Sequence, residues 1–238
     1  MKPRFIAMVG RKGGVGKSAL TLGLAACYAH KGKRVLLVDL DPQGSASLAL
    51  GADGTGGNLA AVLLGDAKPE TVTYDTFFNC PPIALLPGGP ELENINAACP
   101  LRESLADVPA DYVLIDCPPG HADLDRFAMK AADIVLACCE PHRLAIAGAA
   151  RVLDEARAIK PRPRCAVVLG RLDERRGLDT AAPALLAGAF SVPVLIVRQD
   201  ATLALALNAG SLPPASGRAA ADIETVCRWI DKQTEREA

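Results

Sequence analysis

A glycine-rich segment near the start of the chain carries lysines and a hydroxyl in a spacing that suits phosphate chemistry. Residues 10–18 read Gly-Arg-Lys-Gly-Gly-Val-Gly-Lys-Ser, which fits the pattern G-x-x-x-x-G-K-[ST]. An apolar run precedes the segment and a stretch with helical spacing follows it, so it joins a strand to a helix. The glycines let backbone N–H groups curl around phosphate oxygens at a helix N-terminus. We expect Lys17 to bridge the β- and γ-phosphates of a nucleotide and the Ser18 hydroxyl to ligate Mg²⁺.

Carboxylates follow two of the apolar runs. Residues 35–38 are continuously apolar and lead into Asp-Leu-Asp-Pro-Gln-Gly, which contains Asp39 and Asp41. Because side chains alternate along a strand, these two acids are expected on the same side of it. Asp116 ends a second apolar run and has the position of a Walker B acid, which holds the water shell of Mg²⁺. The acids would then lie at the carboxyl ends of strands, where α/β folds bind ligands. A role for Asp39 and Asp41 as mere caps of the next helix is the alternative.

Alternating strands and helices must position these residues. Buried strands are predicted by apolar runs at residues 5–9, 35–38, 83–86, 113–115, 134–138, 166–169 and 194–197. Helices are predicted at residues 17–30, 144–159, 180–189 and 219–232, and a glycine-rich surface loop at residues 51–58. Strands separated by helices imply parallel crossovers. We therefore predict a single α/β domain over residues 1–238, with the P-loop NTPase fold, a mostly parallel twisted sheet and helices on both faces.

The composition agrees with such a domain. The chain has 238 residues and 50% hydrophobic content, enough for one sizeable core. Its net charge of −1 forces no global attraction to nucleic acid or to an acidic membrane. The eight cysteines are scattered, without a CxxC pair, and are interpreted as small hydrophobic residues. We recognise neither a signal peptide nor a membrane-spanning run, which predicts a cytoplasmic protein.

Lys12, a second lysine in the glycine-rich segment, makes the motif more specific. The sequence Lys-Gly-Gly-Val-Gly-Lys-Ser resembles the deviant Walker A motif of the ParA/MinD superfamily of ATPases. Residues 39–44 resemble the second signature of that family, D-x-D-P-Q-G, and residues 116–120, Asp-Cys-Pro-Pro-Gly, resemble its switch II loop. The short N-terminal segment is similar to that of the small ParA-type partition proteins.

The resemblance implies a role for each of these residues. Lys12 would reach across a dimer interface to the nucleotide of the partner, where a cation neutralises charge during phosphoryl transfer. A solvated loop lysine is the alternative. The implied catalytic residues are Lys12, Lys17 and Asp41. The implied Mg²⁺ site, with some contacts through water, consists of Ser18, Asp41 and Asp116. The implied nucleotide-binding residues are Arg11, Lys12, Gly13, Gly14, Val15, Gly16, Lys17, Ser18, Ala19, Asp39 and Pro118.

The resemblance also implies a function. The chain would be a switch ATPase with ATP and Mg²⁺ as cofactors, forming a homodimer in the ATP state and partitioning or positioning DNA or protein cargo. A cargo-bound activator protein of the ParB type, or an equivalent, would stimulate hydrolysis. The resemblance leaves open whether the protein binds nonspecific DNA and associates with the nucleoid.

Some positions depart from the family pattern. Ser18 and Ala19 replace the usual pair of hydroxyl residues, which leaves one hydroxyl for Mg²⁺ and removes a secondary phosphate contact. Gly170 stands where relatives often carry Asn or Thr near the base. Thr202 stands where chromosomal members carry a DNA-contacting arginine, and Arg198 is the substitute that the sequence offers.

Three other readings stay open. A membrane-surface ATPase of the MinD type needs an amphipathic C-terminal helix, whereas the stripe containing Ile223, Val226 and Ile230 is better suited to packing on the sheet. An electron-transfer ATPase resembling the nitrogenase iron protein needs two cluster cysteines per chain. Cys99 is reminiscent of the first, but Asp123 stands at the expected place of the second. A metabolic kinase or ligase is the third reading, although nothing in the sequence marks an acceptor site.

Overall fold

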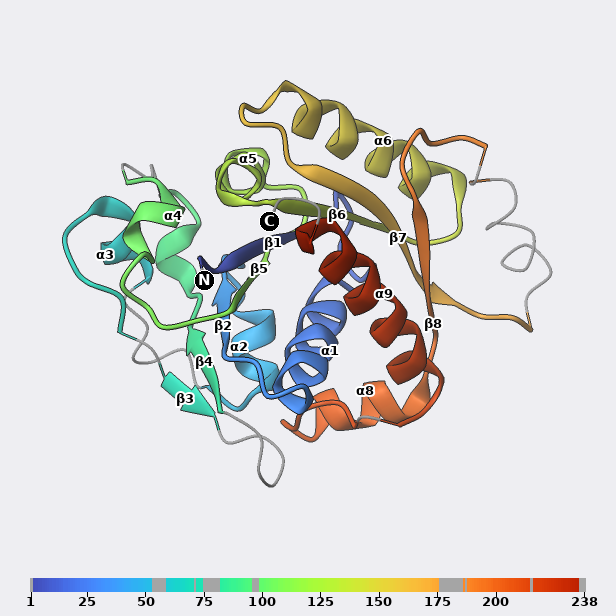
Figure 1. Cartoon of the computed structure of the whole chain (residues 1–238), viewed down its shortest axis with the longest axis horizontal. Helices are drawn as coiled ribbons and strands as arrows, with labels where there is room; N and C mark the ends of the chain where they lie inside the picture. The colour runs from blue at the N-terminus through green and yellow to red at the C-terminus, as the bar shows by residue number, and fades with distance from the viewer. Residues whose placement is uncertain are drawn as a thin grey trace.

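The computed structural model describes residues 2–52, 59–70, 72–74, 82–95, 99–175, 186, 188–214 and 216–235. All strands in these ranges belong to one eight-stranded sheet with the order β3-β4-β2-β5-β1-β6-β7-β8 (Figure 1). The strands are β1 (Arg4–Val9), β2 (Val35–Asp39), β3 (Val72–Tyr74), β4 (Ile83–Leu86), β5 (Tyr112–Asp116), β6 (Ile134–Cys139), β7 (Arg164–Leu172) and β8 (Val194–Arg198). Neighbouring strands are parallel except β3 and β4. The predicted strands and the mostly parallel sheet are confirmed, and only the short edge strand β3 is additional.

Most of the described helices lie between strands along the chain, and the last two follow the last strand. These helices are α1 (Lys17–His30), α2 (Ser45–Ala49), α3 (Leu59–Leu64), α4 (Leu101–Ser104), α5 (Ala122–Ala131), α6 (Arg143–Ala158), α8 (Ala201–Asn208) and α9 (Arg218–Glu235). The predicted helices at residues 17–30, 144–159 and 219–232 correspond to α1, α6 and α9. The helix α5 is not among the predicted helices. Its first turn carries two acids, and His121 caps it by accepting a hydrogen bond from the Leu124 amide. Most of the predicted helix at 180–189, and most of the loop at 51–58, lie outside the described residues.

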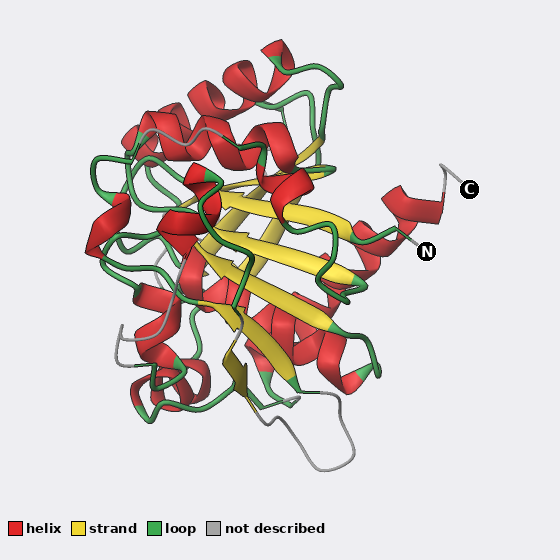
Figure 2. Cartoon of the chain, turned by 90° about the vertical axis from the view of Figure 1, so that its left-hand side faces the viewer, coloured by secondary structure: helices red, strands yellow, loops and turns green. Residues whose placement is uncertain are grey.

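Period-two alternation along the strands produces a hydrophobic core on each face of the sheet. In β1, Phe5, Ala7 and Val9 pack with residues of α5 and α6. Ile6 and Met8 point to the other face and pack with residues of α1 and α9. Figure 2 shows the twisted sheet between these two helical layers. Because every central strand is buried on both faces, its sequence is a continuous apolar run rather than an alternating one.

The order of the strands brings the candidate site together. β1, β2 and β5 are neighbours at the centre of the sheet, and Asp39 lies opposite Asp116 in the pairing of β2 with β5. β1 pairs with the other edge of β5, with Met8 opposite Asp116. The segment that follows β1 therefore leaves the sheet beside both carboxylates, at the carboxyl ends of the strands.

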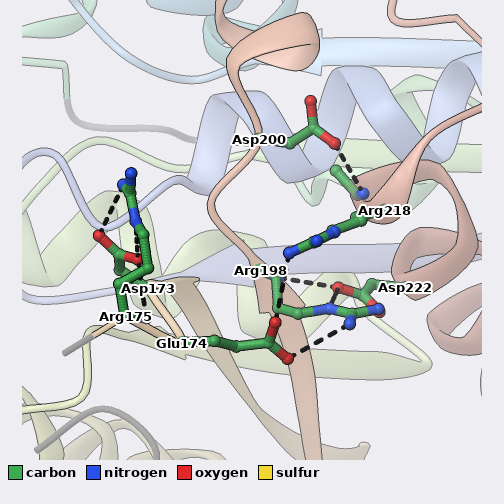
Figure 3. Close-up of polar contacts among 8 residues, drawn as sticks. Asp173, Glu174, Arg175, Arg198, Asp200, Arg218 and Asp222 are labelled. Carbon is green, nitrogen blue, oxygen red and sulfur yellow. Dashed lines mark hydrogen bonds and ion pairs between the residues drawn. The ribbon is translucent and has the colours of Figure 1, made fainter. Parts of the chain in front are cut away.

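The C-terminal helix α9 is fixed to the sheet by an ion-pair network shown in Figure 3. At the end of β8, the Arg198 guanidinium donates to both carboxylate oxygens of Asp222 in α9, at 2.9 and 2.8 Å. Arg198 also donates to Glu174 at 3.3 Å, and Arg218 donates to the other oxygen of Glu174 at 3.3 Å. Asp200 caps α8 by accepting from the backbone amide of Thr202 at 2.7 Å. The two carboxylates of Asp222 and Glu174 raise the pKa of Arg198, as expected for a bidentate pair.

We expect Arg198→Ala to lower the free energy of unfolding by about 1 kcal/mol, because Asp222 is left half-buried without its bidentate partner. Urea denaturation followed by circular dichroism measures this change. Arg175→Ala is the matched control, since Arg175 pairs with Asp173 but is fully exposed, so its loss should not measurably alter stability. If the two substitutions changed the free energy of unfolding equally, the Arg198–Asp222 pair would contribute no more to stability than an exposed pair.

Candidate nucleotide site

The segment between β1 and α1 has the backbone shape of a phosphate-binding loop. Gly14 and Gly16 have φ values of 77° and 94°, a region that L side chains rarely adopt, so glycine is required at both positions. Gly16 occupies the N-cap of α1, and Lys17, which begins the helix, is a buried residue with 6% exposure. Arg171 donates to the Gly14 carbonyl at 2.8 Å and so packs against the outside of the loop. The loop presents the N-terminus of α1 to any anion bound there.

Asp116 provides a buried carboxylate behind this loop. Its side chain is fully buried, and one oxygen accepts a hydrogen bond from the Thr21 hydroxyl at 3.2 Å. The other oxygen, Oδ2, has no hydrogen-bond partner in the described part of the chain. Burial is the main cause that raises the pKa of Asp116 to about 7; nearby Asp39 adds to the rise, whereas a hydrogen bond from Ser18 lowers the pKa. A buried carboxylate oxygen without a partner, close to the Ser18 hydroxyl, fits a hard cation such as Mg²⁺.

The two acids after β2 also organise the turn into α2. Asp39 accepts from the Ser47 amide at 2.8 Å and from the Ser47 hydroxyl at 2.7 Å. Asp41 accepts from the Gln43 amide and from the Ser45 hydroxyl, both at 2.9 Å. Burial raises the pKa of Asp39 to about 6, although its hydrogen bonds with Ser47 act in the opposite direction. The structural role that the sequence left as an alternative is therefore present, and it holds both carboxylates beside the phosphate loop.

The loop after β4 packs against the same turn. A Cβ atom at Gly88 would lie 2.5 Å from the Asp39 carbonyl oxygen and 2.6 Å from that of Asp41. The Gly88 amide also donates to the Ser47 hydroxyl at 3.2 Å. Only glycine allows this close approach, so the Pro-Gly-Gly sequence after β4 fixes the position of the two acids.

Arg11 and Lys12 have different surroundings, although they are adjacent. The Arg11 guanidinium pairs with Asp125 of α5 at 3.0 Å and with Glu155 of α6. Any contact of Arg11 with a nucleotide would therefore involve its backbone rather than its side chain. Lys12 has a side chain that is 56% exposed, and it donates to Glu140 at 3.0 Å. Lys12 is therefore a surface lysine that pairs with a carboxylate of its own chain.

Glu140 collects several hydrogen-bond donors at the end of β6. His142 accepts from the Ala145 amide through Nδ1, so a neutral imidazole carries its proton on Nε2 and donates to Glu140 at 3.0 Å. Arg171 approaches the other oxygen of Glu140 at 3.5 Å. Burial acts to raise the pKa of Glu140, but the hydrogen bonds from Lys12 and His142 outweigh it and lower the pKa. Glu140 thus holds the exposed side of the phosphate loop.

The segment with the sequence Asp-Cys-Pro-Pro-Gly lies next to the phosphate loop. A Cβ atom at Gly13 would be 3.9 Å from the Pro119 side chain, and Gly120 has a φ of 69°. Pro118, predicted to bind nucleotide, precedes these residues in the same short segment after β5. This arrangement suits a loop that responds to the phosphates, because a displacement of either loop changes its contact with the other.

A cavity of about 630 Å³ lies beside the phosphate loop, between the ends of β7 and β8 and helix α8. Val15 and Ala19 line it from the loop side, and Gly170 and Leu203 line it from the other side. A Cβ atom at Gly170 would lie 2.6 Å from the Val15 carbonyl oxygen. The departure from the family pattern at Gly170 therefore has a steric reason in this chain, because a larger residue would push the strand away from the loop.

The sequence also led to expectations for Arg198 and for the C-terminal helix α9, which lie away from the phosphate loop. Arg198, the sequence-based substitute for a DNA-contacting arginine, is committed to Asp222 and Glu174, so it is not a free cation in this state. The stripe of α9 that contains Val226 and Ile230 is buried in the core, as predicted. Within the described ranges, every helix is too short or too polar to cross a lipid bilayer.

Comparisons with known proteins identify the family of this chain. Residues 3–167 match the family model described as AAA domain. The chromosome-partitioning ATPase Soj of Thermus thermophilus is 38% identical over 186 residues, covering 74% of this chain and 72% of Soj. The chromosome partitioning protein ParA of Caulobacter vibrioides is 34% identical, with the same coverage of 74% and 72%. The septum site-determining protein MinD of Pyrococcus horikoshii, solved with Mg-ADP, has a TM-score of 0.77 and 26% identity, and 99% of each chain is covered. This chain belongs to the ParA/MinD superfamily of P-loop ATPases, with ATP and Mg²⁺ as its cofactors.

Proposed function

We propose that the chain is a switch ATPase that closes into a homodimer over ATP and thereby partitions or positions cargo. The observation that carries the proposal is the placement of two lysines in one loop. Lys17 is buried at the start of α1, whereas Lys12 is mostly exposed on the outer edge of the loop. A lysine at each place can serve a different nucleotide, one in its own chain and one in a second copy.

The residues of the chain divide the work on bound ATP. Lys17 and the amides of the phosphate loop bind the β- and γ-phosphates, and the base occupies the cavity beside Val15 and Gly170. Ser18 and Asp116 would hold Mg²⁺, which supplies charge neutralisation at the phosphates. Asp41, fixed by its hydrogen bonds from Gln43 and Ser45, orients the attacking water.

Lys12 must leave Glu140 before it can reach a second copy of the chain. The Lys12–Glu140 ion pair is at the surface, where such pairs contribute little, so the exchange costs little free energy. A triphosphate of the second copy offers more negative charge than a single carboxylate and therefore competes well for the ammonium. Dimerisation would in this way depend on bound ATP.

The cargo belongs to the same proposal. Soj of Thermus thermophilus and ParA of Caulobacter vibrioides are chromosome-partitioning proteins by name, which favours DNA or a DNA-bound complex as cargo for this chain. A ParB-type activator protein, or an equivalent bound to protein cargo, would stimulate hydrolysis and release the dimer. The cytoplasm is the compartment in which such a switch would act.

The role of Lys12 is tested by Lys12→Ala. We expect weaker ATP-dependent dimerisation, measured by light scattering with a slowly hydrolysed ATP analogue, and turnover lowered by about 1000-fold, as for loss of an arginine finger. Glu140→Gln is the matched control, since it weakens the ion pair within the chain but keeps the ammonium, and it should still dimerise. Lys17→Ala should lose nucleotide binding and remain monomeric. Normal dimerisation and turnover in Lys12→Ala would rule out its action on a second chain.

The role of Asp41 is tested by Asp41→Ala, which should retain ATP, remain dimeric and lower turnover by about 100-fold or more, because the attacking water is no longer oriented. Phosphate release and retained nucleotide are the measurements. Ser45→Ala is the control, since it removes one hydrogen bond to Asp41 but leaves the carboxylate, and turnover should stay near wild type. Loss of ATP binding in Asp41→Ala would assign the residue to the structure of the loop instead.

Nonspecific DNA binding is tested by a gel shift at low salt with and without ATP. We expect an ATP-dependent shift that disappears as salt increases, because phosphate contacts release counterions. Lys17→Ala, which should not bind nucleotide, is the control. Absence of any ATP-dependent shift would remove DNA from the proposal and leave protein cargo.

A further inference from the structure

Two cysteines and a carboxylate meet where α1 packs against α9, near the C-terminal end of α1, whereas the phosphate loop lies at its N-terminal end. Sγ of Cys27 in α1 lies 3.0 Å from Sγ of Cys227 in α9, although the residues are 200 positions apart in the sequence. Oε2 of Glu224, one helical turn before Cys227, lies 3.0 Å from Sγ of Cys27. The three possible ligand atoms all lie within 4.8 Å of one another. None of these side chains has a role in the proposed ATPase cycle.

The geometry is close to that of a metal site. Zn–S bonds of about 2.3 Å in a tetrahedral site place two sulfur atoms about 3.8 Å apart. The two sulfur atoms would therefore need to separate by less than about 1 Å to admit the ion. Side-chain rotation is enough for such a shift, because Cys27 and Glu224 are only partly buried.

The charges also favour a divalent ion. Two thiolates and one carboxylate carry three negative charges, and Lys31 supplies one positive charge at 3.3 Å from Glu224. A divalent cation brings this group to neutrality, and its binding releases the two thiol protons. Thiolate ligands select soft or borderline ions such as Zn²⁺ over Mg²⁺.

A cavity gives access to the cluster. Its volume is about 440 Å³, and Cys27, Lys31 and Glu224 line it together with residues before and within α9. Cys227 lies behind them and is fully buried. An ion can therefore enter from the side of Cys27 and Glu224, and water from the cavity can complete a fourth coordination position.

We propose that Cys27, Cys227 and Glu224 form a binding site for a thiophilic divalent cation of the zinc class. The ion would join α1, which begins at the phosphate loop, to α9, which is joined to β8 through Arg198 and Asp222. This metal site does not rest on the proposed ATPase cycle. Its residues lie at the contact between α1 and α9, and metal binding there needs no nucleotide.

The test uses the full chain without an affinity tag, reduced, stripped with a chelator and free of nucleotide. Titration with Co²⁺ should give a sulfur-to-cobalt charge-transfer band that saturates at roughly one ion per chain, and Zn²⁺ should abolish the band by displacement. Excess Mg²⁺ should leave the band unchanged. Zn²⁺ should also raise the Tm, because it binds the folded chain.

Variants assign the band to the cluster. Cys227→Ser should weaken metal affinity by about 100-fold, and Glu224→Gln, at a more exposed position, by about 10-fold. Cys165→Ser is the matched control, because Cys165 is a partly buried cysteine of β7 outside the cluster, and the band should persist. A band that survives Cys227→Ser and Glu224→Gln overturns the proposal. The proposal is also overturned if the reduced protein binds no Co²⁺ but forms a Cys27–Cys227 disulfide in air.

Discussion

The site depends on a carboxylate that is buried at the carboxyl end of the central strand β5. Taking Asp116 out of water carries a large free-energy cost, and one of its oxygens has no partner among the described residues. The fold tolerates this because α1 brings Lys17, Ser18 and Thr21 over the strand end. A bound cation and triphosphate would relieve the remaining cost, so the site is most stable when it is loaded. In the strand order, β1 and β2 lie on either side of β5, which brings the loops that follow both strands next to this carboxylate.

Side-chain contacts that differ in burial hold the outer side of the phosphate loop. Arg11 is anchored to the fully buried Asp125, and Arg171 holds the Gly14 carbonyl. Lys12 pairs with Glu140 while its own side chain stays 56% exposed. Arg11 is therefore held at a buried carboxylate, while the lysine that would act on another chain is held by a pair at the surface. Such a division lets a dimer form without rebuilding the nucleotide site.

Much of the fold could be predicted from the sequence, because strands buried on both faces leave continuous apolar runs and the motifs lie at their ends. The short strand β3 could not, since three residues carry no periodicity. The helix α5 is missed although Leu124, Ala128 and Met129 recur with helical spacing on its buried face. At the site, the spacing of Lys17, Asp41 and Asp116 indicates their places. The partners of Lys12 and Arg11 depend on side chains more than a hundred residues away, and no local pattern reports such contacts. Thr21 could have been found, because it lies one helical turn after Lys17 and faces the same strand end.

The contact between Gly170 and the Val15 carbonyl has a consequence for how this enzyme can evolve. In the proposed complex, the base lies against a strand whose nearest position cannot carry a side chain. Discrimination among purines must then come from the other residues that line the cavity, among them Gln199 and Asn208. Single substitutions at these positions can therefore change the nucleotide preference, whereas Gly170 cannot be replaced without moving the strand away from the loop.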